Sequence, residues 1–150
     1  MNAVSEGESY MKYAINELIK VIKWEDRALR QFLIRAKNLI ASDREVYFQN
    51  LFTDRKIIIH SFEKNQVISI YQQDKLNEIR VEIKSYKNIK QVNYMENSEE
   101  DNYINSSILE VIFNDESIII LDSVKDTNRT HGRYYTDIIL SILQQIKEYN

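Results

Sequence analysis

The chain has 150 residues, of which 43% are hydrophobic and 29% charged, and this composition fits one globular domain that can bury its own core. It contains no cysteine and only two histidines, which excludes disulfide frameworks, thiolate metal sites, iron–sulfur clusters and a cysteine nucleophile. The net charge of −3 is unevenly spread: residues 44–95 carry nine basic and six acidic groups, whereas residues 96–150 carry four basic and eleven acidic groups, which argues against a nucleic-acid-binding protein.

Residues 9–41 have the periodicity of an amphipathic helix. Their apolar positions recur every three or four residues, at Met11, Ile15, Leu18, Ile22, Leu29, Leu33, Ala36 and Ile40. A second helix that starts at Asp26, after Trp24, is the alternative. No Gly, Pro, Asn or Ser near residues 23–28 is present to form a tight turn. We therefore predict one long helix, straight or bent near Trp24, in preference to a helical hairpin.

A helix of this length would span about 48 Å, which exceeds the width of a small domain. Unless it bends back at Trp24, part of its apolar stripe would extend beyond the body of the protein and need a cover. A second copy of the chain is the simplest cover. We therefore predict an N-terminal helical segment, residues 1–43, which supports a homodimer through Leu29, Leu33, Ala36 and Ile40.

From residue 45 the apolar period changes to two, which indicates strands. We predict strands over residues 45–52, 56–62, 66–72, 79–84, 107–113 and 117–122, with a seventh around 90–94. The chain has two glycines and no proline, so the hairpin turns are expected to use Asn and Asp, the residues that best tolerate positive φ after glycine. The polar stretches 95–106 and 123–133 are predicted as loops.

Two of the predicted strands are apolar on both faces, at Ile57–Ile59 and at Ile118–Leu121. A strand with one solvated face alternates, so we expect helices from both ends of the chain to cover both sides of the sheet at these positions. The C-terminal helix is predicted over residues 134–149. Its buried stripe follows a three-four pattern: Tyr135, Ile138, Ile139, Ile142, Ile146 and Tyr149.

The segment Ile83–Val92 begins as a strand and then places Tyr86, Ile89 and Val92 three residues apart. Together with the hairpin of residues 109–121 and the final helix, it resembles the pleckstrin-homology-like (PH-like) superfold, particularly its small bacterial versions and the related GRAM domains. The resemblance covers residues 44–150. It implies an α+β fold: an antiparallel meander or barrel that the C-terminal helix closes, with a corner after Lys84 and with Ile89 and Val92 facing inward.

Two groups of basic residues are candidate anion or partner surfaces. Arg129, His131 and Arg133 precede the C-terminal helix, whose first N–H groups attract negative charge. The simpler interpretation is that Asn128 or Thr130 caps this helix. Lys84, Lys87 and Lys90 follow the predicted corner.

The resemblance gives little support for lipid binding by these lysines. The basic lipid motif of the PH-like family lies in an early hairpin, where this chain has only Lys64 and Lys75. His60 lies within a predicted strand, where a structural or surface-facing role is expected.

The residues form no recognisable catalytic constellation. Glycine occurs only at positions 7 and 132, so a Gly-rich phosphate loop is excluded. We predict no enzyme activity, no cofactor and no metal, and a non-enzymatic protein-interaction module in the bacterial cytoplasm. Two alternatives remain: a small enzyme or ligand-binding protein that uses the barrel mouth or residues 125–133, and an acidic inhibitor or immunity-type protein for a basic partner. The sequence shows neither a transmembrane segment nor a secretory signal, and we expect no binding to membrane surfaces or nucleic acid.

Overall fold

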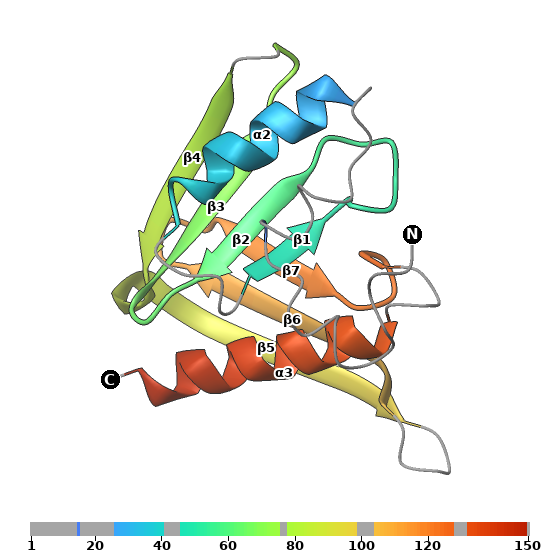
Figure 1. Ribbon diagram of the computed structural model, residues 1–150. Coiled ribbons are helices and arrows are strands. Elements are labelled where there is room, and N and C mark those ends of the chain that lie inside the picture. The colour runs from blue at the N-terminus through green and yellow to red at the C-terminus, as the bar shows by residue number, and fades with distance from the viewer. Residues whose placement is uncertain are drawn as a thin grey trace.

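The computed structural model describes residue 15 and residues 26–40, 46–75, 78–98, 104–127 and 132–149. Over these residues the chain forms two antiparallel sheets, two α-helices and a short 3₁₀ helix (Figure 1). The predicted α+β class is therefore confirmed. Within the described residues, no helix is long and apolar enough to cross a membrane.

The first sheet, called sheet A, has the strand order β1-β2-β3-β4. Its strands are β1 (Val46–Gln49), β2 (Ile58–Phe62), β3 (Gln66–Gln72) and β4 (Ile79–Ser85). Side chains alternate between its two faces. One face contributes Phe48, Ile59, Ile68 and Ile70 to a core beneath the helix α2, and the other contributes Tyr47, Phe62 and Val67 to a second core.

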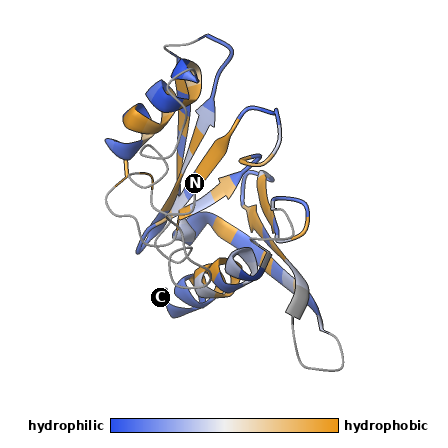
Figure 2. Ribbon diagram, turned by 45° about the vertical axis from the view of Figure 1, so that its right-hand side comes forward, coloured by the Kyte–Doolittle hydropathy of each residue, from blue (hydrophilic) through white to orange (hydrophobic). Residues whose placement is uncertain are grey.

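The helix α2 (Arg27–Lys37) covers the first of these faces (Figures 1 and 2). It begins where the Asp26 carboxylate accepts the Leu29 N–H at 3.2 Å, a side-chain N-cap. Buried Phe32, Leu33 and Ala36 lie on its sheet-facing side, whereas the arginines face outward or lie at the border.

The prediction of one long N-terminal helix is wrong, because α2 starts after a cap at Asp26. Ile15 is helical and is buried in the same core cluster as Leu33. In a continuous helix these two residues would lie about 27 Å apart, at 1.5 Å per residue. A single straight helix is therefore not compatible with the burial of both residues in this cluster. The Asp26 cap starts a helix here, although no Gly or Pro lies near it. Most of residues 9–25, including Trp24, lie outside the described residues.

The second sheet, called sheet B, has the order β5-β6-β7. Its strands are β5 (Ile89–Ser98), β6 (Ile104–Phe113) and β7 (Ile118–Asp122). The 3₁₀ helix η2 (Tyr86–Asn88) joins β4 to β5, and Ser85 caps it by accepting the Lys87 N–H. Tyr86 is buried, and Ile89 and Val92 pack against the core. The predicted corner is therefore confirmed.

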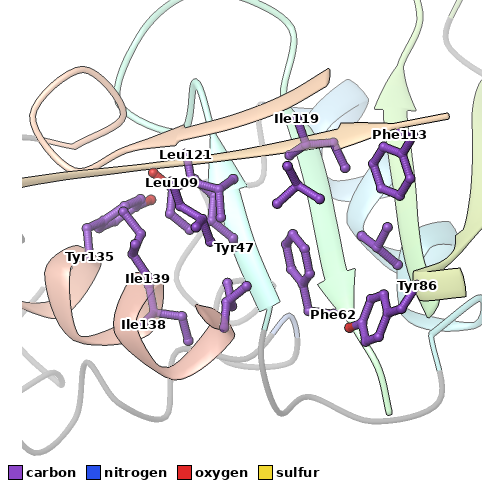
Figure 3. Packing of buried hydrophobic residues seen from close by; sticks show 13 residues of the cluster. Tyr47, Phe62, Tyr86, Leu109, Phe113, Ile119, Leu121, Tyr135, Ile138 and Ile139 are labelled. Atoms are coloured by element: carbon purple, nitrogen blue, oxygen red, sulfur yellow. The ribbon is translucent and has the colours of Figure 1, made fainter. Parts of the chain in front are cut away.

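The helix α3 (Gly132–Glu148) packs along the core formed by both sheets (Figures 1 and 3). Figure 3 shows Tyr135 and Ile139 pointing toward Tyr47 and Leu121. The predicted buried stripe of this helix is confirmed, since four of its members are buried and Ile146 and Tyr149 pack at its margin. These side chains fill the space between α3 and the sheets.

The two sheets do not join into a closed barrel, which contradicts the prediction of a closed meander. Instead, side chains of β1 bridge to the backbone of β7. The Gln49 Nε2 donates to the Ile120 carbonyl at 3.0 Å, and the Tyr47 hydroxyl donates to the Asp122 carbonyl at 3.3 Å. Tyr47 and Phe62 are among the large side chains that fill the core between the sheets.

Other local predictions differ from the structure. Strand β5 extends to Ser98 and strand β6 begins at Ile104, so most of the predicted loop 95–106 is sheet. In the β6–β7 turn the residue with positive φ is Glu116, at 72°, rather than Asn114 or Asp115. The first isoleucine ribbon is covered as expected. The second is not, because alternate residues of β7 are exposed.

Candidate functional site

The predicted basic cluster before α3 is only partly described. Arg129 and His131 lie outside the described residues. Arg133 is exposed in the first turn of α3, and its charge partly offsets the burial that raises the pKa of Asp137. The structure therefore does not bring these three residues together into a described site.

The three predicted lysines at the corner contact different partners. Lys84 is half-buried; its Nζ donates to the Ser117 hydroxyl at 2.5 Å and lies 5.0 Å from the ring centroid of Phe113. The Lys90 Nζ lies 2.7 Å from a Glu116 carboxylate oxygen. Lys87 is exposed on η2. The ionic and hydrogen-bonding capacity of Lys84 and Lys90 is thus used within the protein.

The predicted dimer face is packed within the chain. Leu33 and Ala36 are completely buried in the core beneath α2, and Leu29 and Ile40 are half-buried at its edge. The apolar stripe of α2 therefore stabilises the monomer by covering sheet A.

A buried polar seam, formed by Gln49, His60 and Ser69, crosses sheet A on the side that faces sheet B. His60 lies 2.6 Å from Gln49 Oε1 through Nε2 and 2.8 Å from Ser69 Oγ through Nδ1. Since the Gln49 amide nitrogen donates to the Ile120 carbonyl, its oxygen must accept from His60 Nε2–H. Nδ1 is then the acceptor for the Ser69 hydroxyl. His60 is neutral, and burial lowers its pKa to about 3, with a smaller contribution from Lys84.

A second buried polar group joins β1 to the turn after β7. The Tyr47 hydroxyl donates to Asp126 Oδ2 at 2.6 Å, and the same oxygen accepts the Asp122 N–H at 2.9 Å. Burial raises the pKa of Asp126, and these hydrogen bonds oppose the increase. Burial, reinforced by the Asp126 charge, raises the pKa of Tyr47. The pair therefore works as a structural clamp between the sheets.

Replacing Tyr47 by Phe should reduce the free energy of unfolding by about 1.5–3 kcal/mol, because the buried Asp126 carboxylate loses a donor that it cannot regain from water. Denaturant unfolding at pH 7 would measure this. Tyr94→Phe is the matched control, since its hydroxyl also bonds a carboxylate, Glu96, at 2.6 Å but at the surface. We expect the free energy of unfolding of the control to fall by less than about 0.5 kcal/mol. Equal losses of stability in both variants would contradict a structural role for the buried Tyr47–Asp126 hydrogen bond.

The most unusual surface lies on the outer side of sheet B, away from α3. Leu109, Val111, Ile119 and Leu121 point into the core, so their strand neighbours face outward. Those neighbours form what we call the outer isoleucine face: Met95, Ile108, Ile112, Ile118 and Ile120.

Three members of the outer isoleucine face are largely exposed: Met95 at 56%, Ile118 at 52% and Ile120 at 45%. The register places Ile118 opposite Ile112 and Ile108 opposite Met95, with Ile120 and its partner Glu110 in the row between these two pairs. Isolated exposed aliphatic residues are ordinary, but a contiguous group on one sheet face is typical of interaction sites.

The edge of β7 beside this face is already occupied. The Ile120 carbonyl accepts from Gln49, the Asp122 carbonyl accepts from Tyr47, and the Asp122 N–H donates to Asp126. A new strand could not pair along β7 without breaking these bonds. The face of sheet B, and not the β7 edge, is therefore the accessible feature.

Two carboxylates, Glu110 and Asp122, lie on the same side of sheet B as the outer isoleucine face. Over residues 89–98 and 104–127 the chain carries six acidic residues and two lysines, a net charge of −4. Of the six, Asp126 is buried between the sheets and Glu116 pairs with Lys90. Glu110 lies within the face, beside Ile120, and accepts from Asn93 at 3.1 Å. By contrast, α2 carries four basic residues and no acidic one: Arg27, Arg30, Arg35 and Lys37. The two sides of the protein thus have opposite charge.

Sequence reasoning missed this face for an identifiable reason. A run of four apolar residues in a strand is typical of burial on both sides, and Ile118–Leu121 was interpreted in that way. The exposure of this strand follows from its place at the edge of sheet B, which the sequence does not indicate. Among the described residues, no group of three or more His, Asp or Glu side chains could hold a metal ion.

Comparisons with protein-family models, curated proteins and solved structures give no match for this chain.

Proposed function

We propose that this chain is a non-enzymatic protein-interaction module that binds another protein on its outer isoleucine face. Exposure of Ile118 and Ile120 on a strand whose alternate residues, Ile119 and Leu121, are buried carries this proposal. Removing aliphatic surface from water contributes roughly 25 cal/mol per Å², so a partner that covers these side chains gains affinity. The proposal also places the protein in the cytoplasm, where a chain without cysteine has no need of oxidation.

A PH-like core supports the same proposal. Sheet A, the corner at η2, sheet B and a final helix follow one another along the chain, and we interpret this order as PH-like. In such an arrangement α3 and sheet A cover one side of sheet B and leave the other side for contacts. The chain would then use a rigid sheet surface as its binding platform.

The occupied β7 edge indicates how the partner docks. Since Gln49, Tyr47 and Asp126 satisfy backbone groups of Ile120 and Asp122, the partner must lie across the sheet and contact side chains. A homodimer through the apolar stripe of α2 is not part of the proposal, because that stripe packs on sheet A.

Site-specific crosslinking would test the proposal. A photo-reactive amino acid at position 118 should form a covalent adduct with another protein in the cells that make this chain. The same group at position 83 is the control, because Ile83 is also exposed, at 61%, but lies on β4 outside the outer isoleucine face. An adduct from position 118 that disappears when Ile120 is changed to Ser is the expected result. Identical products from both positions, or none from position 118, would refute the proposal.

A further inference from the structure

The outer isoleucine face is bordered by negative charge, and we infer that its partner is a basic amphipathic segment of another protein, with aliphatic side chains flanked by Lys or Arg. This inference rests on the proposed function and adds the chemistry of the partner. Charge complementarity between such a segment and the border of the face is the argument.

The negative charges lie at both ends of β7. At its start, Asp115 accepts both the backbone N–H and the hydroxyl of Ser117, at 3.0 and 2.6 Å, and these bonds lower its pKa. At its end, Asp122 accepts the N–H groups of Val124 and Lys125, each at 3.0 Å. Asp122 therefore lies on the outer side of sheet B with Ile120, whereas Asp115 lies in the turn before Ile118, where the charge of Lys84 also lowers its pKa.

The spacing of these groups sets the dimensions of the partner. Asp115 and Asp122 are seven residues apart across a turn and a strand, a separation of about 20 Å or less at 3.3 Å per residue. Ile118 and Ile120 lie between them. A helix of about 13 residues, with an aliphatic stripe and a cationic side chain near each end, would match this length. Its aliphatic stripe would cover the face while its ends meet the carboxylates.

A second copy of the same face is a poor partner. Two such faces would bring Glu110 and Asp122 of one chain against the same acidic residues of the other, and like charges in an interface oppose association. The basic outward side of α2 in a second copy has the right charge, but it would give head-to-tail contacts that extend into chains. Self-association of this kind is therefore an outcome that the test must detect.

The test uses fluorescence anisotropy with three labelled 14-residue helical peptides built from Leu and Lys, added to the full-length protein. The first peptide has an apolar stripe with lysines on the other face, the second has Glu at each Lys, and the third is a scrambled Leu–Lys peptide. Two double variants of the protein accompany the wild type: Ile118→Ser with Ile120→Ser, and Val81→Ser with Ile83→Ser as a matched pair of exposed β4 residues.

We expect the amphipathic basic peptide to bind at least tenfold more tightly than the other two. Its affinity should fall at least tenfold in the β7 variant, stay within twofold in the β4 variant, and fall several-fold from 50 to 300 mM salt. Equal or tighter binding of the acidic peptide, or affinity that does not depend on Ile118 and Ile120, would overturn the inference. If the basic peptide does not bind but crosslinking from position 118 succeeds, the basic amphipathic partner is overturned and the proposed function stands. A mass in light scattering that rises with protein concentration in the wild type, but not in the β7 variant, would show that the face mediates self-association instead.

Discussion

Lowering the pH from 7 to 5 should reduce the free energy of unfolding by about 2 kcal/mol through His60 alone. In the folded protein the pKa of His60 is lowered to about 3, chiefly by burial, whereas the unfolded chain has the ordinary value of 6.5. Above pH 7 the imidazole is neutral in both states and has no effect on the pH dependence. Below pH 6.5 only the unfolded chain takes up the proton, so unfolding becomes progressively easier.

The full effect is reached near pH 3, where the difference of about 3.5 pKa units corresponds to roughly 4–5 kcal/mol. Protonating folded His60 would place a positive charge inside the protein, near Lys84, and put a second N–H against the Ser69 hydroxyl that now donates to it. Nothing in the neutral seam can accept this proton without losing a hydrogen bond. The stability is therefore present above pH 6.5 and is lost as the pH falls toward 3.

Urea unfolding at pH 7, 6 and 5 would measure this slope in the wild type and in His60→Gln. The Gln amide can donate to Gln49 and accept from Ser69 without titrating, so the variant is expected to lose most of the slope between pH 7 and 5, whatever its absolute stability. Carboxylates such as Asp126 titrate in both proteins and cancel in the difference. Parallel slopes for the two proteins would show that His60 is not buried in its neutral form.

The elements with strong periodicity could be predicted from the sequence. The C-terminal helix and strand β3 agree with prediction because their apolar spacing is regular, and the corner at Tyr86 agrees with what the resemblance implied. The start of α2 at Arg27 could not be predicted, since the apolar positions of residues 9–41 keep one helical phase across it. A capping aspartate at residue 26 was the only local signal for this start.

The contacts that join the sheets could not be predicted. Tyr47 and Asp126 are 79 residues apart, and Gln49 and Ile120 are 71 apart, so no local pattern connects them. The outer isoleucine face depends in addition on which strand lies at the sheet edge. Strand order is set by the packing of the whole chain. The hydrophobic period of a strand does not determine whether both of its faces are covered.

Replacing Leu33 by Ala should destabilise the protein by about 2–5 kcal/mol, a large part of the total stability of a domain of this size. Leu33 is completely buried between α2 and sheet A, where its removal leaves a cavity lined by residues such as Phe32, Ile59 and Ile70. Leu33→Asp should prevent folding, because an unpaired carboxylate would replace an apolar side chain in that core.

Ile34→Ala is the matched control, since Ile34 is the next residue of the same helix but is exposed at 44%. We expect its unfolding free energy to stay within about 0.5 kcal/mol of the wild type. Denaturant unfolding and light scattering on the same samples distinguish two roles for Leu33. If α2 covers sheet A within one chain, Leu33→Ala lowers stability and leaves the mass unchanged. If instead the stripe joins two chains, the substitution halves the mass and its effect on unfolding depends on protein concentration. The second result would contradict the packing of α2, because a side chain buried within one chain cannot also be the contact with a second.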